Sequence, residues 1–209
     1  MKDKGFSLVE LIIVIAIMAI LAASIAPALI RYINKSRKAD DIAFGDSLGT
    51  MIGAAMTENE SIYEYITYSV GMDSDFGSAS KTYRLITYMS AGTQMNAFRL
   101  NALSGLDNNI YSEANTEVGR IMGELMGKSV VKPKFNKPAD LDQWLICVDK
   151  NYNLYVFVGG HVNNSVWNLD SNGDYNGQGS TRHAYMIWPH VDPRYNALTT
   201  PNDVARDQP

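Results

Sequence analysis

The sequence predicts an α+β fold in which a long, kinked N-terminal helix packs on a C-terminal antiparallel sheet. Three observations lead to it: an uncharged apolar stretch at residues 11–30, helical periodicity that continues to about residue 58, and short β-rich runs between residues 141 and 198. The helix is predicted over residues 6–58, apolar all round in its first half and amphipathic in its second. The amphipathic half is expected to cover one face of the sheet.

The composition is that of one globular domain with an appendage. The chain has 209 residues, of which 46% are hydrophobic and 19% are charged, and its formal net charge is −4. An acidic chain offers no chain-wide basic surface, so no nucleic-acid partner is predicted. Cys147 is the single cysteine, which excludes an intramolecular disulfide, and we expect it to be a small buried hydrophobe.

The apolar stretch at residues 11–30 is long enough to span a membrane. As a helix it would extend over roughly 30 Å, the thickness of one hydrocarbon core. A secretory signal peptide is the alternative, because two lysines precede the stretch and a small-x-small site lies near its end at residues 26–28. The length of the stretch and the carboxylate of Glu10 argue against that alternative.

Glu10 is a carboxylate in apolar surroundings and therefore needs a partner. An unpaired carboxylate inside a membrane helix costs about 2.5–3.5 kcal/mol on insertion scales. Cleavage between Gly5 and Phe6 would create an α-amino group four residues before Glu10, which would lie in the first helical turn, where the macrodipole favours an acid. Two interpretations stay open: pairing with such an amine, or snorkelling of the side chain to a lipid headgroup.

The run Lys4-Gly5-Phe6-Ser7-Leu8-Val9-Glu10 is followed by an apolar helix that contains Pro27. Over residues 1–31 this combination resembles the N-terminus of type IV pilins and the related pseudopilins. The resemblance implies a leader peptide of residues 1–5, cleavage after Gly5, and N-methylation of the new terminus at Phe6. It also implies that Glu10 attracts the terminal amine of a neighbouring subunit during assembly.

The resemblance further implies partners and a location. These are a prepilin peptidase that also methylates, an assembly platform with its ATPase, the membrane before assembly, and other copies of the chain in a homopolymer. The precursor is expected in the inner or cytoplasmic membrane with its leader in the cytoplasm and its body outside, and the processed chain in an extracellular pilus. The count of basic residues alone would place the body inside, but the specific motif outweighs that count.

A structural subunit of a type IV pilus is the leading functional hypothesis. A pseudopilin or minor pilin of a type II secretion or competence machine would share the same N-terminus, and a single-span anchored adhesin or binding protein is the rival from another class. No enzyme is predicted, because the sequence holds no nucleophile elbow, phosphate loop or paired-carboxylate motif. His161, His183 and His190 are too scattered to indicate a metal site.

Pro27 lacks an N–H and clashes with the preceding turn, so the helix is predicted to kink or unwind around residues 23–27. By the resemblance, Pro27 is an assembly residue, and this stretch would melt so that the subunit can extend. A charged cluster then follows the apolar stretch: Arg31, Lys35, Arg37, Lys38, Asp40 and Asp41. It is interpreted as a solvated helix surface, and in a filament it could pair with neighbours.

Residues 59–140 are expected to connect the helix to the sheet, as the variable connector does in the pilin architecture. Residues 60–81 show no clear pattern, and residues 83–89 favour a strand. An apolar stripe predicts an amphipathic helix at residues 113–126, capped by Ser112 or Asn115 and stopped by Gly127.

The sheet is predicted within residues 141–198 as four antiparallel strands. Residues 144–148 and 154–158 predict a hairpin around a polar turn, and residues 162–169 and 183–188 extend it. Residues 199–209 are expected to form a polar, poorly ordered tail.

Side-chain oxygens recur at every second position of one loop, namely at Asp170, Asn172, Asp174 and Asn176. A hard cation such as Ca²⁺ needs that arrangement, although Tyr175 stands where an EF-hand loop requires Gly and Thr181 where it requires Glu. The loop is therefore a calcium candidate, with simple turn formation as the alternative, and no other metal or cofactor is predicted. Many relatives close this region with a disulfide, and the glycine-rich loop is expected to brace it here.

Overall fold

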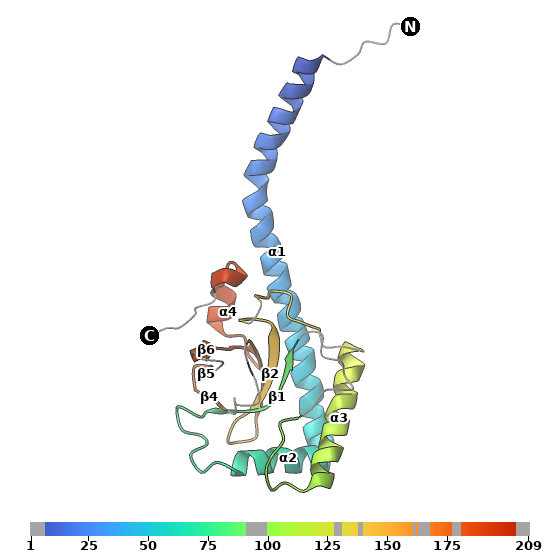
Figure 1. The fold of residues 1–209 in the computed structure, drawn as a ribbon, viewed down its shortest axis with the longest axis vertical. Helices are drawn as coiled ribbons and strands as arrows, with labels where there is room; N and C mark the ends of the chain where they lie inside the picture. The colour runs from blue at the N-terminus through green and yellow to red at the C-terminus, as the bar shows by residue number, and fades with distance from the viewer. Residues whose placement is uncertain are drawn as a thin grey trace.

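The computed structural model describes residues 7–90, 100–127, 131–137, 140–160, 162, 168–176 and 181–203. It confirms the α+β fold. Helix α1 (Leu8–Glu58) projects from the body as a rod, and only its second half packs on a five-stranded antiparallel sheet (Figure 1). The helix ends at Glu58, where the periodicity predicted its end.

The second half of α1 approaches the sheet closely because it presents small residues to it. A Cβ atom on Gly45 would lie 2.5 Å from Cγ2 of Ile187, and one on Gly49 would lie 2.4 Å from a ring carbon of Trp188. Leu48 and Ile52 are buried on the same stripe. Glycine therefore sets the distance between α1 and the edge strand β7 (Tyr185–Trp188).

Helix α2 (Glu60–Gly71) was not predicted, because its Tyr- and Ser-rich composition hides a regular stripe. Its buried residues fall at helical spacing: Ile62, Tyr65, Ile66 and Ser69. Asn59 ends α1 and caps α2, since its side chain accepts a hydrogen bond from the N–H of Ile62 at 3.1 Å. The predicted connector therefore begins with a helix.

Helix α3 (Asn108–Met126) starts earlier than predicted. Its N-cap is Asp107 and not Ser112 or Asn115, and Oδ1 of Asn115 instead accepts the N–H of Leu100 at 2.8 Å. The predicted stop is confirmed, because Gly127 follows the helix with a φ of 77°, which favours glycine. Helix α3 packs on α1 and α2.

The main sheet has the strand order β4-β1-β2-β3-β7. The predicted hairpin is confirmed as β2 (Gln143–Val148) and β3 (Leu154–Gly159), and β1 (Tyr83–Ser90) pairs antiparallel with β2. The edge strand β4 (Asn168–Leu169) pairs with β1. Because β1 comes from residues 59–140, the connector contributes a strand to the sheet and does not merely lead to it.

The predicted strand at residues 183–188 divides at Ala184. Strand β6 (Thr181–His183) pairs with β5 (Asp174–Asn176) in a separate two-stranded sheet, whereas β7 joins the main sheet. The division occurs because the Ala184 N–H donates to the Gly173 carbonyl at 2.9 Å, away from the main ladder. Of the predicted strand at 162–169, β4 is the part seen as a strand, and residues 163–167 lie outside the described residues.

Both faces of the main sheet are buried, whereas the sequence predicted cover on one face only. One face packs against α1, α2 and α3, and the other carries a second cluster that includes Leu145, Cys147, Phe157 and Tyr175. All six residues of β2 are consequently buried.

The C-terminal residues are more ordered than the predicted tail. Helix α4 (Pro193–Ala197) is followed by the short 3₁₀ helix η2 (Pro201–Asp203). The carboxylate of Asp203 accepts hydrogen bonds from the N–H groups and hydroxyls of Thr199 and Thr200, which lowers the pKa of Asp203 to about 2. Residues 204–209 lie outside the described residues.

Candidate functional site

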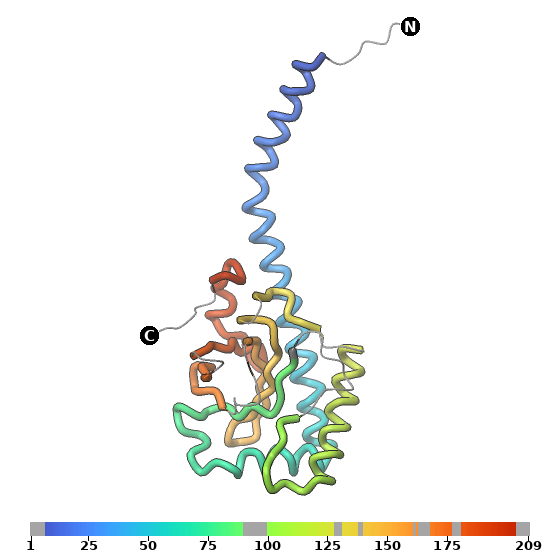
Figure 2. The backbone as a smooth tube through the Cα atoms, viewed as in Figure 1, coloured from blue at the N-terminus to red at the C-terminus, as the bar shows by residue number. Residues whose placement is uncertain are grey.

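The first half of α1 is a continuous apolar surface that the body does not cover. No residue of α1 before Asn34 is buried, and Leu8, Ile20 and Met18 are 73%, 70% and 63% exposed. Figure 2 shows this half extending beyond the rest of the molecule. By length and composition the helix could cross a membrane. So large an apolar surface requires lipid or other protein around it.

Ser7 and Glu10 form a capping box at the start of α1. The Ser7 N–H donates to Oε2 of Glu10 at 2.9 Å, and Oγ of Ser7 accepts the N–H of Val9 at 3.3 Å. The carboxylate is therefore directed toward the helix N-terminus and has a partner within its own chain. Sequence reasoning considered only the charge of Glu10, although the Ser-x-x-Glu spacing was a visible signal for this cap.

The predicted processing site precedes this cap. Gly5 and Phe6 lie outside the described residues, so cleavage after Gly5 and methylation of Phe6 stay predictions.

Pro27 lies inside α1 without interrupting it. Residues 23–27 are helical, and α1 bends gently in this part of Figure 2. Oγ of Ser24 donates to the Leu21 carbonyl at 2.8 Å, one turn before Pro27. The helix therefore accommodates Pro27 by bending, and the local unwinding is not present in this structure.

The charged cluster after the apolar stretch is only partly solvated. Arg31, Lys35 and Arg37 are exposed as predicted, but Lys38 is buried. Nζ of Lys38 donates to the carbonyls of Asn196 and Leu198, each at 2.7 Å. We refer to residues 196–199 as the C-terminal strap. The prediction of a solvated Lys38 was wrong because a lysine can be buried when backbone carbonyls satisfy its donors.

Asp41 is a second buried charge on α1, only 2% exposed. Its carboxylate accepts the N–H of Lys134 at 2.6 Å, the N–H of Phe135 at 2.8 Å and the hydroxyl of Tyr195 at 3.0 Å. It thereby joins residues 134–135 and α4 to α1. Its prediction as part of a solvated surface was also wrong, since its partners are distant in sequence.

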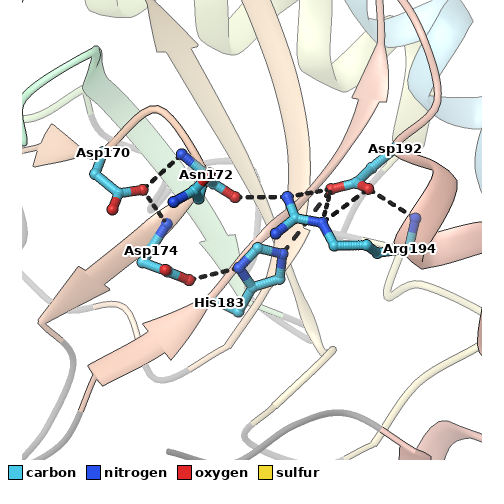
Figure 3. Close-up of polar contacts among 6 residues, drawn as sticks. All are labelled: Asp170, Asn172, Asp174, His183, Asp192 and Arg194. Atoms are coloured by element: carbon cyan, nitrogen blue, oxygen red, sulfur yellow. Dashed lines mark hydrogen bonds and ion pairs between the residues drawn. The ribbon is translucent and has the colours of Figure 1, made fainter. Parts of the chain in front are cut away.

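The calcium-candidate loop is built from turns that side chains stabilise (Figure 3). Oδ1 of Asp170 accepts the N–H of Asn172 at 2.7 Å and that of Asp174 at 2.8 Å. Gly173 has a φ of 86°, and a Cβ there would lie 2.4 Å from the Ala184 carbonyl oxygen. These contacts fit the turn-forming alternative that the sequence left open.

His183 lies between two carboxylates beside this loop. Nδ1 of His183 is 2.5 Å from Oδ1 of Asp174, and Nε2 is 3.9 Å from Oδ2 of Asp192 (Figure 3). Nη2 of Arg194 donates to the Asn172 carbonyl at 2.7 Å and to Asp192 at 2.8 Å. Burial by itself raises the pKa of Asp192, but the hydrogen bonds from Arg194 outweigh it and leave that pKa below its ordinary value.

The contacts of His183, Asp192 and Arg194 brace the C-terminal region without a disulfide.

In the described part of the chain, no three His, Cys, Asp or Glu side chains are grouped as a metal ion would require. Asp174 faces His183, whereas Asp170 binds the backbone of its own loop. Calcium binding by Asp170, Asn172, Asp174 and Asn176 therefore stays a prediction.

The remaining candidate residues are not brought together. Cys147 is fully buried, and burial raises the pKa of its thiol well above the ordinary value. His190 is exposed, and His161 lies outside the described residues. Cys147 is thus a core residue, as predicted.

Comparisons with known proteins agree with the features of α1. A family model described as "Prokaryotic N-terminal methylation motif" matches residues 1–26. The chain is also 42% identical, over 58 residues, to proteins of Dichelobacter nodosus named "Type IV major fimbrial protein FimA" and "Fimbrial protein". The match covers 28% of this chain and 36% of those relatives. No solved structure matches the chain significantly. The methylation motif, the likeness to fimbrial proteins over 58 residues and the helix-on-sheet fold make the chain similar to type IV pilins.

Proposed function

We propose that the chain is a structural subunit of a type IV pilus that polymerises through the first half of α1. One observation carries the proposal: an apolar half-helix without a buried residue is continuous with a half-helix that belongs to a well-packed body. The body already has its own core, so the exposed half is not needed for folding. Its apolar surface is available for lipid first and for other copies of the same helix later.

In this proposal, processing provides the charge that assembly needs. Cleavage after Gly5 leaves a free α-amine on Phe6, next to the capping box of Ser7 and Glu10, and the peptidase then transfers a methyl group to that amine from a methyl donor. The Glu10 carboxylate is directed toward that end of the helix. When subunits align, the amine of one copy compensates Glu10 of its neighbour in a dry bundle of helices, where both charges require a partner.

The proposal includes a location and partners for each stage. The precursor lies in the inner or cytoplasmic membrane with its body outside, and a prepilin peptidase acts on its cytoplasmic leader. The assembly platform and its ATPase then extract the processed subunit into an extracellular homopolymer. The names of the relatives support this stage, because they are fimbrial proteins.

The substitution Glu10→Gln separates charge from capping. Glutamine at this position can still accept the Ser7 N–H, so the helix start is retained while the charge is removed. We expect a processed, membrane-held subunit and few or no sheared surface fibres. Glu58→Gln is the matched control, since it removes an exposed acid from the other end of α1 and should leave fibre yield unchanged. Normal fibres from Glu10→Gln would refute charge pairing.

Intact-mass and N-terminal analysis of the mature protein tests processing directly. The expected chain begins at N-methylated Phe6. A chain that begins at Met1, or after the small-x-small site at residues 26–28, would contradict the proposal. Abundance in sheared fibres then separates a major pilus subunit from a pseudopilin, which would be present only in traces, and from an anchored adhesin, which would stay with the membrane.

A further inference from the structure

A groove of about 520 Å³ lies between α1 and the C-terminal strap. Three hydrogen bonds hold the strap beside α1. Nδ2 of Asn34 donates to the Thr199 carbonyl at 3.0 Å, and Nζ of Lys38 donates to two further strap carbonyls. Figure 1 shows α4, which leads into the strap, at the end of the body from which α1 projects. The groove is therefore next to the point where the exposed helix begins.

Apolar side chains and basic side chains both line the groove. Leu198 and Ile42 contribute apolar surface, and the charged residues that line it are Arg31, Lys35 and Lys38, with no acid among the lining residues. Lys38 is committed to the strap, whereas Arg31 and Lys35 are exposed. Within the described residues no ion pair joins either of these two to an acid. Positions 31, 35 and 38 share one helix face, so their charges converge on the groove.

The position of these charges along α1 matches a membrane surface. Arg31 is the first charged residue after the apolar residues 11–30. At 1.5 Å per residue, Arg31 and Lys35 lie roughly 1.5 and 7.5 Å beyond the hydrocarbon core. The headgroup layer on each side of that core is about 5–7 Å thick. The groove would therefore open at the depth of lipid phosphates.

We propose that this groove binds the headgroup of an anionic phospholipid while the subunit is in the membrane. The lipid phosphate pairs with Arg31 and Lys35, and the glycerol and first acyl carbons contact Leu198 and Ile42. This inference rests on the membrane-held precursor of the proposed function. An acidic body would otherwise be repelled by an anionic surface, and the groove supplies a local attraction that fixes the strap side of the body against the membrane.

Photo-crosslinking in nanodiscs tests this contact. The full-length precursor is placed in phosphatidylcholine nanodiscs that contain phosphatidylglycerol with a photoreactive headgroup, and crosslinks are mapped by mass spectrometry. We expect them in the peptides that carry residues 31–39 and 196–199. Each of Arg31→Gln and Lys35→Gln should lower that yield about fivefold, the effect of one basic residue at an anionic surface. Thermal unfolding of each variant should match that of the wild type.

Arg37→Gln is the control, because it removes the same charge from an exposed residue, two positions beyond Lys35 on α1, that does not line the groove. It should lower the yield less than either groove variant. An equal loss would show diffuse surface attraction and would overturn the inference. Equal capture of a photoreactive phosphatidylcholine would also overturn it. So would a carbodiimide crosslink from Lys35 to an acid of another chain, which would assign the groove to an acidic segment of a second copy.

The Glu10→Gln precursor separates this inference from the proposed function. It should capture phosphatidylglycerol as the wild type does while failing to form fibres. Normal fibres from Glu10→Gln would contradict pilus assembly by charge pairing and leave the lipid contact standing. If Glu10→Gln fails to form fibres and the wild-type precursor gives no lipid crosslinks in the groove, the lipid contact alone is refuted.

Discussion

In α1 the apolar half is exposed to solvent, whereas the polar half contains buried charged residues. Leu8 in the apolar half is 73% exposed, whereas Asp41 in the polar half is 2% exposed and Lys38 is 9% exposed. Lys38 and Asp41 are buried because each has hydrogen-bond partners on the body that are distant in sequence. The apolar half is exposed because none of the described part of the body packs against it. A helix can therefore serve folding with one half and assembly with the other.

The largest expected effect is on the polar half. Asp41→Ala would leave the buried N–H of Phe135, the part-buried N–H of Lys134 and the Tyr195 hydroxyl without their acceptor, which should cost about 3–5 kcal/mol in the free energy of unfolding. Asp40→Asn is the control, since Asp40 is an exposed neighbour that pairs with Lys134 at the surface, and it should cost less than about 1 kcal/mol. Chemical denaturation of the full chain in detergent measures both. Similar losses would contradict the role given to Asp41.

A smaller loss is expected where α1 meets β7. Gly49→Ala would place a Cβ 2.4 Å from the Trp188 ring and should destabilise the body by about 1–3 kcal/mol. Gly53→Ala is the matched control, because no atom lies within 4 Å of the added Cβ, and it should be neutral or stabilising by up to about 1 kcal/mol. Equal stabilities for the two variants, measured by denaturant midpoint, would show that the close approach is not required.

The ion pair between Asp192 and Arg194 should make the stability of the C-terminal region depend on pH in the acid range. Asp192→Asn weakens its bonds to Arg194, which is half exposed, so the expected cost at neutral pH is about 1–2 kcal/mol. Because the folded pKa of Asp192 lies below the unfolded value of about 3.9, this stability is present above that value and is lost as pH falls through the folded pKa. Wild-type and variant unfolding curves should therefore converge in acid. A constant difference down to low pH would exclude this linkage.

The smallest effect on stability is expected in the apolar half. Ile20→Ala removes apolar surface that contacts nothing in the body, so the free energy of unfolding should change by less than about 0.5 kcal/mol. Fibre yield should nevertheless fall, because the same surface would be buried between helices in a filament. A large loss of body stability would mean that the two halves are not independent.

Local signals predicted the fold class but missed features where the apolar stripe of a helix is interrupted or begins late. The β2–β3 hairpin and the end of α3 at Gly127 follow from patterns within a few residues. Helix α2 was missed because tyrosines and Ser69 occupy its buried stripe, and a strict hydrophobicity pattern does not register them. The cap at Asp107 was missed because the apolar stripe of α3 begins later than the helix itself.

By itself the sequence determined the N-terminal motif, the long helix and the hairpin, since periodicity and short motifs depend only on neighbouring residues. Only the tertiary structure decided which charges of α1 are buried. Asp41 bonds to Phe135 across 94 positions and Lys38 bonds to Leu198 across 160. Whether such a charge is solvated or satisfied in a core depends on backbone groups that the folded chain brings to it, and no local pattern encodes that arrangement.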